Sequence, residues 1–309
     1  MSPGSPLEAL ERSLAAMGLR PVRDEPLSRH TTFRIGGPAD LWVAVADPER
    51  LAEAVGVAGD MGVPVTLLGG GSNVLVSDRG IRGLVVQFHS PLGRPEVGEE
   101  GTVRVPCGVP LAGLARWAVR QGLGGLEWAV GIPGTVGGAV LGNAGAYGGC
   151  MADALERVQV LERGGGRRWV ERAEAGLGYR TSRWKAASVR PMLLMAELRL
   201  QPAPAEVLQG RAERYQAERR ARQPREPSAG SVFRNPEGLA AGRLIEEAGL
   251  KGVRIGGAVV SPRHANYIVN AGGALAQDVW ALVEHIQEAV WKATGIHLEP
   301  EIERLGEWT

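Results

Sequence analysis

The sequence has 309 residues, of which 44% are hydrophobic and 22% are charged, and its formal net charge is +1. This length and composition predict a globular protein of two or three domains. The near-neutral charge argues against a nucleic-acid or membrane-surface partner, and two cysteines are too few for a disulfide scaffold or a four-cysteine metal site.

The N-terminus has no basic segment followed by an apolar core, so we expect no signal peptide. No apolar run approaches the roughly 20 residues needed to span a bilayer. The cysteine content suits a reducing compartment. We therefore expect a cytoplasmic protein without a metal centre.

The first ninety residues alternate helix and strand signals. Apolar spacing predicts helices at residues 7–19 and 48–61, with Asp47 as the N-cap of the second. Alternating or β-branched runs predict strands at residues 41–45, 63–68, 74–76 and 83–88. The strand at 63–68 runs into three glycines, so we expect a βαβ-like unit with a glycine-rich turn at a strand end, a common position for ligands.

The rest of the chain reads as a mixture of sheet and helix. We expect strands at residues 102–106, 157–162, 169–171 and 191–200, the last three in an antiparallel sheet, and a helix at 111–121. A charged helix at 205–222 is predicted to be a solvated connector. Helices are expected at 239–248 and 275–294, with Gly249 and Gly295 just beyond them, and strands at 258–260, 266–269 and 296–305.

Residues 69–73, Gly-Gly-Gly-Ser-Asn, form a candidate phosphate site. Successive backbone N–H groups in such a run converge on an anion, and Ser72 and Asn73 add side-chain donors. The segment is not a Walker loop, because the chain has no Gly-Lys pair, and it does not match the dinucleotide fingerprint. A flexible hairpin turn is the alternative.

Residues 131–149 form a second glycine-rich segment. Tight turns around Pro133 and Gly134 would expose N–H groups, and Thr135 adds a hydroxyl. The many missing Cβ atoms suit the close approach of a large ligand. The alternative is a buried linker, which would be long and structureless for a compact domain.

Several polar residues further along are candidates for chemistry. Ser231 follows Gly230 in a sharp turn, where a serine is commonly a cap or a turn residue. Three carboxylates, those of Glu299, Glu301 and Glu303, would share one face of an alternating strand. They would form either an exposed edge or a site with a cationic partner, for which Arg180 is a candidate.

Seven segments, taken in order, resemble the UDP-N-acetylenolpyruvoylglucosamine reductase family in its shorter subtype (type II). They are residues 31–37 (Thr-Thr-Phe-Arg-Ile-Gly-Gly), 69–78, 131–149, 179–180 (Tyr-Arg), 230–236, 264–270 and 298–301. The resemblance implies an α+β fold with a vanillyl-alcohol-oxidase-type (PCMH-like) FAD-binding domain of two subdomains and a C-terminal α+β substrate domain. Residues 1–90 with 296–309 would form the first subdomain, 91–204 the second, and 205–295 the substrate domain.

The resemblance also implies an activity. The family reduces UDP-N-acetylglucosamine enolpyruvate to UDP-N-acetylmuramate with NADPH, through non-covalently bound FAD, in peptidoglycan precursor synthesis. Hydride would reach C3 of the enolpyruvyl group, Arg180 and Glu301 would stabilise the enediolate-like charge, and Ser231 would protonate C2. We expect a monomer that acts on small molecules.

The family pattern carries over to individual residues of this chain. The implied cofactor-binding residues are Gly69, Gly70, Gly71, Ser72, Asn73, Gly131, Ile132, Pro133, Gly134, Thr135, Gly137, Gly138, Asn143, Gly145 and Ala146, and the implied substrate-binding residues are Asn235, Arg234, His264 and Tyr179. Asn266 is either a further substrate contact or a satisfied core residue.

The sequence departs from the family pattern at two positions. Arg234 stands where the family has lysine, and Glu303 stands where the family ending has arginine, here displaced to Arg304. Glu301 is kept as the catalytic carboxylate because it directly follows the Leu-Glu-Pro segment.

Two other functions are weighed against the reductase. One is a sugar-lactone or alcohol oxidase of the same superfamily. Many such oxidases attach the flavin through a histidine near the phosphate loop, and no histidine lies between Leu67 and Gly83. The other is a non-catalytic binder of flavin or of a UDP-sugar, which would not need Arg180, Ser231 and Glu301 together.

Overall fold

The computed structural model describes residues 5–162, 164–185, 187 and 190–308. The chain divides into two compact units and passes from one to the other several times. Unit 1 comprises Met1–Pro21, Val43–Gly70 and Val85–Arg219, and unit 2 comprises Val22–Trp42, Gly71–Leu84 and Arg220–Thr309. The three-part division expected from the sequence stays a prediction.

The N-terminal elements confirm most of the expected helices and strands. They are α1 (Pro6–Ala16), β1 (Val22–Pro26), the 3₁₀ turn Leu27–Arg29, β2 (Pro38–Val45), α2 (Pro48–Asp60), β3 (Val65–Leu68), β4 (Val74–Val76) and β5 (Ile81–Phe88). A four-stranded sheet has the order β1-β2-β5-β3. Because β5 separates β2 from β3, the predicted βαβ-like unit does not pair its own two strands.

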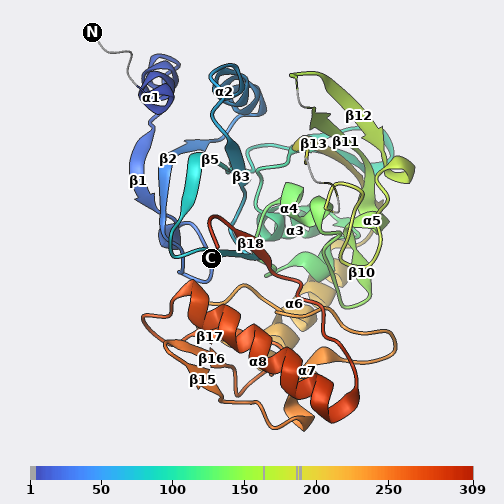
Figure 1. Ribbon diagram of the computed structural model, residues 1–309. Coiled ribbons are helices and arrows are strands. Elements are labelled where there is room, and N and C mark those ends of the chain that lie inside the picture. Colours follow the sequence, from blue (N-terminus) through green and yellow to red (C-terminus); the bar gives the residue numbers. More distant parts are fainter. Residues whose placement is uncertain (1–4, 163, 186, 188–189, 309) are drawn as a thin grey trace. The chain divides into compact units, whose positions relative to one another are not determined.

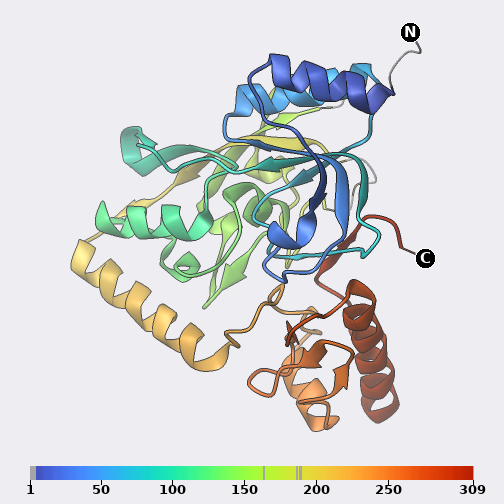
Figure 2. The same cartoon turned by 90° about the vertical axis from the view of Figure 1, so that its left-hand side faces the viewer.

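The two first helices begin at side-chain caps. Ser5 and Glu8 form a capping box at α1, and Asp47 Oδ1 accepts the backbone N–H groups of Glu49 and Arg50 at α2, over 2.8 and 3.1 Å. Such caps satisfy donors that a helix start leaves without partners. The two helices lie side by side (Figures 1 and 2).

Unit 1 contains a five-stranded antiparallel sheet. Its strands are β6 (Glu96–Val97), β7 (Thr102–Pro106), β11 (Leu155–Leu161), β12 (Arg167–Glu171) and β13 (Met192–Arg199), in the order β12-β11-β13-β7-β6. Three of them, β11, β12 and β13, are labelled in Figure 1. Leu194, Ala196 and Leu198 of β13 are fully buried on one face. Side chains alternate along a strand, so Glu197 points to the other face. The antiparallel sheet predicted from the sequence is confirmed.

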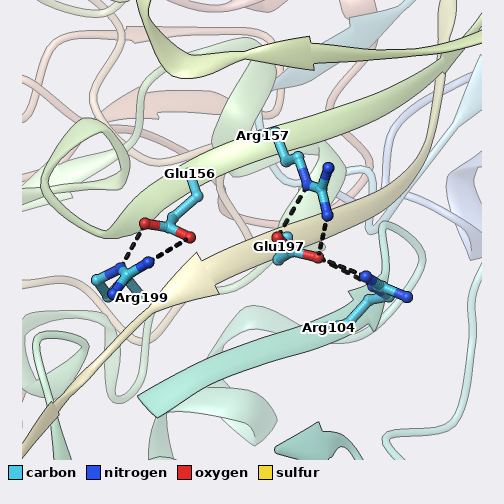
Figure 3. Close-up of polar contacts among 5 residues, drawn as sticks. All are labelled: Arg104, Glu156, Arg157, Glu197 and Arg199. Atoms are coloured by element: carbon cyan, nitrogen blue, oxygen red, sulfur yellow. Dashed lines mark hydrogen bonds and ion pairs between the residues drawn. The ribbon is translucent and has the colours of Figure 1, made fainter. Parts of the chain in front are cut away.

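Glu197 is the centre of an ion cluster on that other face (Figure 3). Its cross-strand partners are Arg157 of β11 and Arg104 of β7, which donate to its carboxylate over 2.9 and 2.7 Å. Burial would raise the pKa of Glu197, but hydrogen bonds and charge from the two arginines outweigh burial and hold that pKa below its ordinary value of 4.5. Both guanidinium groups also lie over the Trp169 ring.

The remaining elements of unit 1 are short, apart from α3 and α6. They are the 3₁₀ turn Glu99–Gly101, α3 (Leu111–Arg120), β8 (Leu123–Gly124), the 3₁₀ turn Glu127–Ala129, α4 (Val136–Leu141), β9 (Gly145–Ala146), β10 (Gly149–Cys150), α5 (Met151–Ala154), the 3₁₀ turn Arg172–Glu174, β14 (Gln201–Pro202) and α6 (Ala205–Arg222). The last three residues of α6 belong to unit 2. The predicted solvated helix at α6 is mostly exposed, but Tyr215 stacks on Tyr147 with ring centroids 4.6 Å apart.

Unit 2 is built around one amphipathic helix. Its C-terminal elements are α7 (Ala241–Glu247), β15 (Arg254–Ile255), β16 (Ala258–Val260), β17 (Ile268–Asn270), α8 (Ala276–Thr294) and β18 (Glu303–Leu305). α8 lies against the sheet β15-β16-β17 (Figure 1) and ends at Gly295 in the left-handed conformation, as predicted. Phe33, Leu75 and Phe233 join the same core.

The expected strand at residues 296–305 is wrong over most of its length. Only β18 is a strand, and it pairs in parallel with β4. Pro300 makes an isolated bridge to Phe233 and has no N–H to continue a ladder. Glu299, Glu301 and Glu303 therefore do not form the predicted common face of a single strand.

Candidate active site

The two glycine-rich segments touch each other directly within unit 1. A Cβ added at Gly70 would lie 2.8 Å from Gly134 Cα, and one added at Gly69 would lie 2.6 Å from Thr135 Oγ1. No diphosphate fits between residues in van der Waals contact. At Gly69 and Gly70 the two segments therefore pack against each other, and a ligand would have to contact other atoms of these segments.

The first glycine-rich segment continues into unit 2 at Gly71. Its φ of +60° is a conformation that glycine favours, and His30 O occupies the space a Cβ would need. The Thr32 N–H donates to Gly71 O over 3.0 Å, and Thr32 Oγ1 donates to Ser228 O over 2.7 Å. Thr32 thus ties the glycine loop to the segment that leads to Ser231.

Asn73, predicted to bind the cofactor, holds the C-terminal segment. Its Nδ2 donates to Glu301 O over 3.1 Å, and its own carbonyl accepts the Glu303 N–H over 2.9 Å. These bonds fix the backbone on both sides of Ile302. The Asn73 side chain is therefore a support for the candidate carboxylate Glu301.

The second glycine-rich segment contains the short helix α4, which the sequence did not indicate. Thr135 caps it, accepting the Gly138 N–H over 3.3 Å. The N–H groups of Val136 and Gly137 donate to the carbonyls of Val109 and Cys107 over 2.9 and 2.8 Å. The first N–H groups of α4 are thus engaged within the protein and are not available to an anion.

Arg180 lies at the corner of a tight turn in unit 1. Gly178 and Thr181 bond each other in both directions, N–H to carbonyl, which leaves Tyr179 and Arg180 at the tip. Arg180 has φ = +55°, a conformation that arginine rarely adopts. Its Nε atom is buried, and its guanidinium lies 5.5 Å from the centroid of the Tyr179 ring.

Two side chains anchor this turn to the end of α4. Asn143 Nδ2 donates to Gly178 O over 2.8 Å, and its Oδ1 accepts the Ala152 N–H over 2.9 Å. The buried Ser182 Oγ donates to Leu141 O over 2.7 Å. Asn143, predicted to bind the cofactor, therefore supports the arginine turn, and both of its polar side-chain atoms are engaged.

Ser231 and Glu301 are brought together by their backbones within unit 2. The Glu301 N–H donates to Val232 O over 2.7 Å, and the Arg234 N–H donates to Glu299 O over 2.9 Å. The two segments therefore run alongside each other. Ser231 and Glu301 are each half-buried, and the Arg234 side chain forms an ion pair with Glu299 over 3.7 Å.

The other predicted substrate residues also occupy defined environments. Asn235 is exposed and its Oδ1 accepts the Ala241 N–H at the start of α7 over 3.0 Å. His264 is half-buried and its Nδ1 accepts the Asn266 N–H over 3.3 Å. Burial lowers the pKa of His264 below its ordinary value of 6.5, and the charges of Lys251 and Arg222 add to this.

Comparison with known proteins identifies the family. A profile described as the C-terminal domain of UDP-N-acetylenolpyruvoylglucosamine reductase matches residues 223–305, and an FAD binding domain profile matches residues 39–171. A relative from Symbiobacterium thermophilum, UDP-N-acetylenolpyruvoylglucosamine reductase 2, is 45% identical over 98% of this chain and 97% of its own length. The chain belongs to the UDP-N-acetylenolpyruvoylglucosamine reductase family.

Two further members of the reductase family support this assignment. The enzyme of the same name from Moorella thermoacetica is 46% identical over 94% of each chain. The crystal structure of the reductase from Thermus caldophilus is 38% identical, superposes with a TM-score of 0.78, and covers 93% of this chain and 98% of that one. These matches confirm the resemblance, the α+β fold class and FAD as the cofactor.

The residues of this reductase fit an FAD diphosphate in their chemistry. The two glycine-rich segments contain no lysine or arginine and offer backbone and small hydroxyl groups. Gly138 is exposed, and a Cβ added there would meet only Thr135 Oγ1, at 3.6 Å. The Cα of Gly138 is therefore sterically accessible to a ligand, unlike that of Gly70, while its N–H is bonded to Thr135.

The supporting roles of three side chains in this reductase could not have been predicted from the sequence. Asn143, Ser182 and Thr32 hold segments that lie 35, 41 and 196 residues away along the chain. Short polar side chains of this kind have no local pattern. In the part of the chain that the structure describes, no helix is long and apolar enough to span a membrane, and no cluster of side chains is suited to a metal ion.

Proposed function

We propose that this chain reduces the enolpyruvyl group of UDP-N-acetylglucosamine enolpyruvate with electrons from NADPH, giving UDP-N-acetylmuramate for peptidoglycan synthesis, and that Arg180, Ser231 and Glu301 carry out the chemistry. Membership of the reductase family over nearly the whole chain supports the reaction. The observation that carries the residue roles is the Glu301–Val232 backbone bond, which places a carboxylate segment beside the serine segment.

Bound FAD supplies the redox chemistry, transfer of a hydride equivalent from NADPH to C3 of the enolpyruvyl double bond. The residues proposed to hold it are the fifteen expected from the sequence, with Gly138 and Thr135 at the start of α4 among them. Because Asn73 and Asn143 already bond the protein through their side chains, any contact they make with FAD would use their remaining atoms.

Arg180 would bind the substrate carboxylate, which gains negative charge as C3 is reduced. A guanidinium offers two coplanar N–H donors that match the two oxygens of a carboxylate. The hydrogen bonds strengthen as negative charge develops on those oxygens. Its turn is held at both ends by Asn143 and Ser182, so its position is fixed before substrate arrives. Preorganisation of this kind lowers the barrier because nothing must reorient during the reaction.

Ser231 would donate its hydroxyl proton to C2. Glu301, protonated or through a hydrogen bond, would help Arg180 to stabilise the negative charge that develops before this step. A serine is a weak acid, but the carbanion-like intermediate is a strong base, so the transfer is downhill. The serine then regains a proton from solvent. Asn235, Arg234, His264 and Tyr179 are proposed to contact the rest of the substrate. We place the enzyme in the cytoplasm as a monomer.

The test separates the two half-reactions in a Ser231→Ala variant. Bleaching of the flavin absorbance by NADPH should proceed at the wild-type rate, while recovery of the colour on adding the enolpyruvyl substrate should slow by about a hundredfold or more, because the general acid is gone. Ser228→Ala is the matched control, since Ser228 lies three residues away and only its backbone carbonyl is bonded to Thr32.

Wild-type speed in both half-reactions of Ser231→Ala would remove Ser231 from the mechanism. Recovery of the colour with oxygen but not with the substrate would instead indicate an oxidase. A protein that binds FAD but is not bleached by NADPH would indicate a binding module.

A further inference from the structure

The Ser231 segment lies between two other segments of unit 2, at Glu299–Glu301 and at Asn266, and forms backbone hydrogen bonds with both. On one side, Val232 O accepts the Glu301 N–H and Arg234 N–H donates to Glu299 O. On the other side, the Val232 N–H donates to Asn266 O over 2.9 Å. The peptide groups of Val232 are thus bonded on both sides, one residue away from Ser231.

Asn266 adds a second pair of bonds through its side chain. The Phe233 N–H donates to Asn266 Oδ1 over 2.9 Å, and Asn266 Nδ2 donates to Phe233 O over 2.8 Å. A carboxamide carries the same donor and acceptor as a peptide group. The side chain of Asn266 therefore replaces the neighbouring strand that the Phe233 backbone would otherwise need.

The burial of Asn266 excludes the alternative of a substrate contact through its amide. Only 4% of the residue is exposed, and both polar atoms of the side chain are bonded to Phe233. Removing the carboxamide would leave a buried N–H and a buried carbonyl without partners, which the backbone relieves by moving. Phe233 is two residues after Ser231 in the chain, so a movement of its backbone also moves the serine.

We infer that Asn266 is a positioning residue. By holding the backbone at Phe233, two residues after Ser231, it sets the location of the Ser231 hydroxyl relative to Glu301. The inference rests on the proposed function, because it concerns proton donation by Ser231. Asn266 touches neither substrate nor cofactor in this role. It acts through the serine, and its effect should vanish when the serine hydroxyl is absent.

A double-mutant cycle on the FAD-loaded enzyme tests this. Asn266→Ala should slow recovery of the flavin colour by the substrate by about a hundredfold, the effect expected of a displacement near 1 Å, and leave bleaching by NADPH unchanged. In a Ser231→Ala background, Asn266→Ala should change the recovery rate by less than about twofold. If the double variant instead slows recovery by the product of the two single effects, the inference is overturned.

Two further variants complete the experiment. Asn270→Ala is the matched control, because Asn270 lies four residues away and its carboxamide bonds the backbone of Phe33 and Gly272, not the serine segment. It should lower stability but leave recovery within about twofold of wild type. If Asn266→Ala fails to fold, Asn266→Asp carries the cycle, since it keeps the acceptor for the Phe233 N–H and replaces the donor to Phe233 O with a carboxylate oxygen.

The failures of the two proposals are distinguishable. A wild-type recovery rate in Ser231→Ala alone contradicts the role of the serine. If Ser231→Ala is slow and its effect on the recovery rate multiplies with that of Asn266→Ala, the catalytic role of Ser231 is retained and the positioning role of Asn266 is rejected. An unchanged recovery rate in Asn266→Asp, with a normal fold, rejects it as well.

Discussion

A single backbone angle marks the candidate arginine. Arg180 has φ = +55° at the third position of a tight turn, where glycine or asparagine is the usual residue. A non-glycine residue in this region stores strain of about 1 kcal/mol or more. Such strain persists where a side chain has a function that glycine lacks, so the angle supports the role proposed for the guanidinium.

We therefore expect Arg180→Gly to be more stable than Arg180→Ala by about 1 kcal/mol, although glycine is ordinarily the less stabilising residue. Both variants lose the guanidinium, so both should lose about a hundredfold or more in kcat/KM for the enolpyruvyl substrate. Urea unfolding measures the first effect and steady-state kinetics the second. Equal stability of the two variants would show that the turn is not strained, and retained activity would remove Arg180 from the site.

At the scale of elements, the glycines of the two glycine-rich segments have two different roles, close packing within the protein and access for a ligand. Gly70 and Gly69 let the loop after β3 pack directly on the start of α4, with Gly134 and Thr135 as its neighbours. Gly138 has no such neighbour and is exposed. Missing Cβ atoms that appeared in the sequence to serve a ligand are thus partly required by the protein's own packing.

Substitution by alanine at one glycine of each kind distinguishes these two roles. Gly70→Ala should lower the free energy of unfolding by about 1–3 kcal/mol, because the added methyl meets backbone that cannot yield cheaply. Gly138→Ala should leave stability unchanged or raise it by up to about 1 kcal/mol, since alanine favours a helix, but it should weaken FAD binding. Thermal unfolding of the apoprotein and FAD titration measure the two effects. Undiminished FAD affinity in Gly138→Ala would exclude close approach of the cofactor there.

Elements with a strong local pattern could be predicted and the others could not. β4, β7, β16 and α6 have the expected bounds, because β-branched runs and a charged helical period are local signals. α4 was not indicated, since six residues with two glycines have little helix propensity, and the Thr135 cap and burial of Val136 and Val140 form it. The motifs indicated Ser231 and Arg180, but the asparagines that hold their segments required the fold.

At the scale of the whole molecule, each unit contains an ionisable group that is at least partly buried and has a lower pKa in the folded protein than in the unfolded chain. They are Glu197 in the sheet of unit 1 and His264 beside the serine segment in unit 2. In each case the unfolded chain binds the proton more readily than the folded one, so stability is present above the ordinary pKa and is lost as the pH falls. The ordinary values, 4.5 and 6.5, place the loss due to His264 at the higher pH.

We accordingly expect the free energy of unfolding to fall as the pH is lowered from about 7.5 to about 5.5, and His264→Gln to remove part of that fall, by at most about 1.4 kcal/mol per pH unit. Protonation of Nδ1 would also remove the acceptor for the Asn266 N–H, which adds a structural reason for the loss. His285→Gln is the control, because His285 is exposed on α8. Urea unfolding at the two pH values measures the difference. An equal fall in wild type and His264→Gln would show that His264 takes up its proton without cost to the fold, and that its buried ring is tolerated in the charged form.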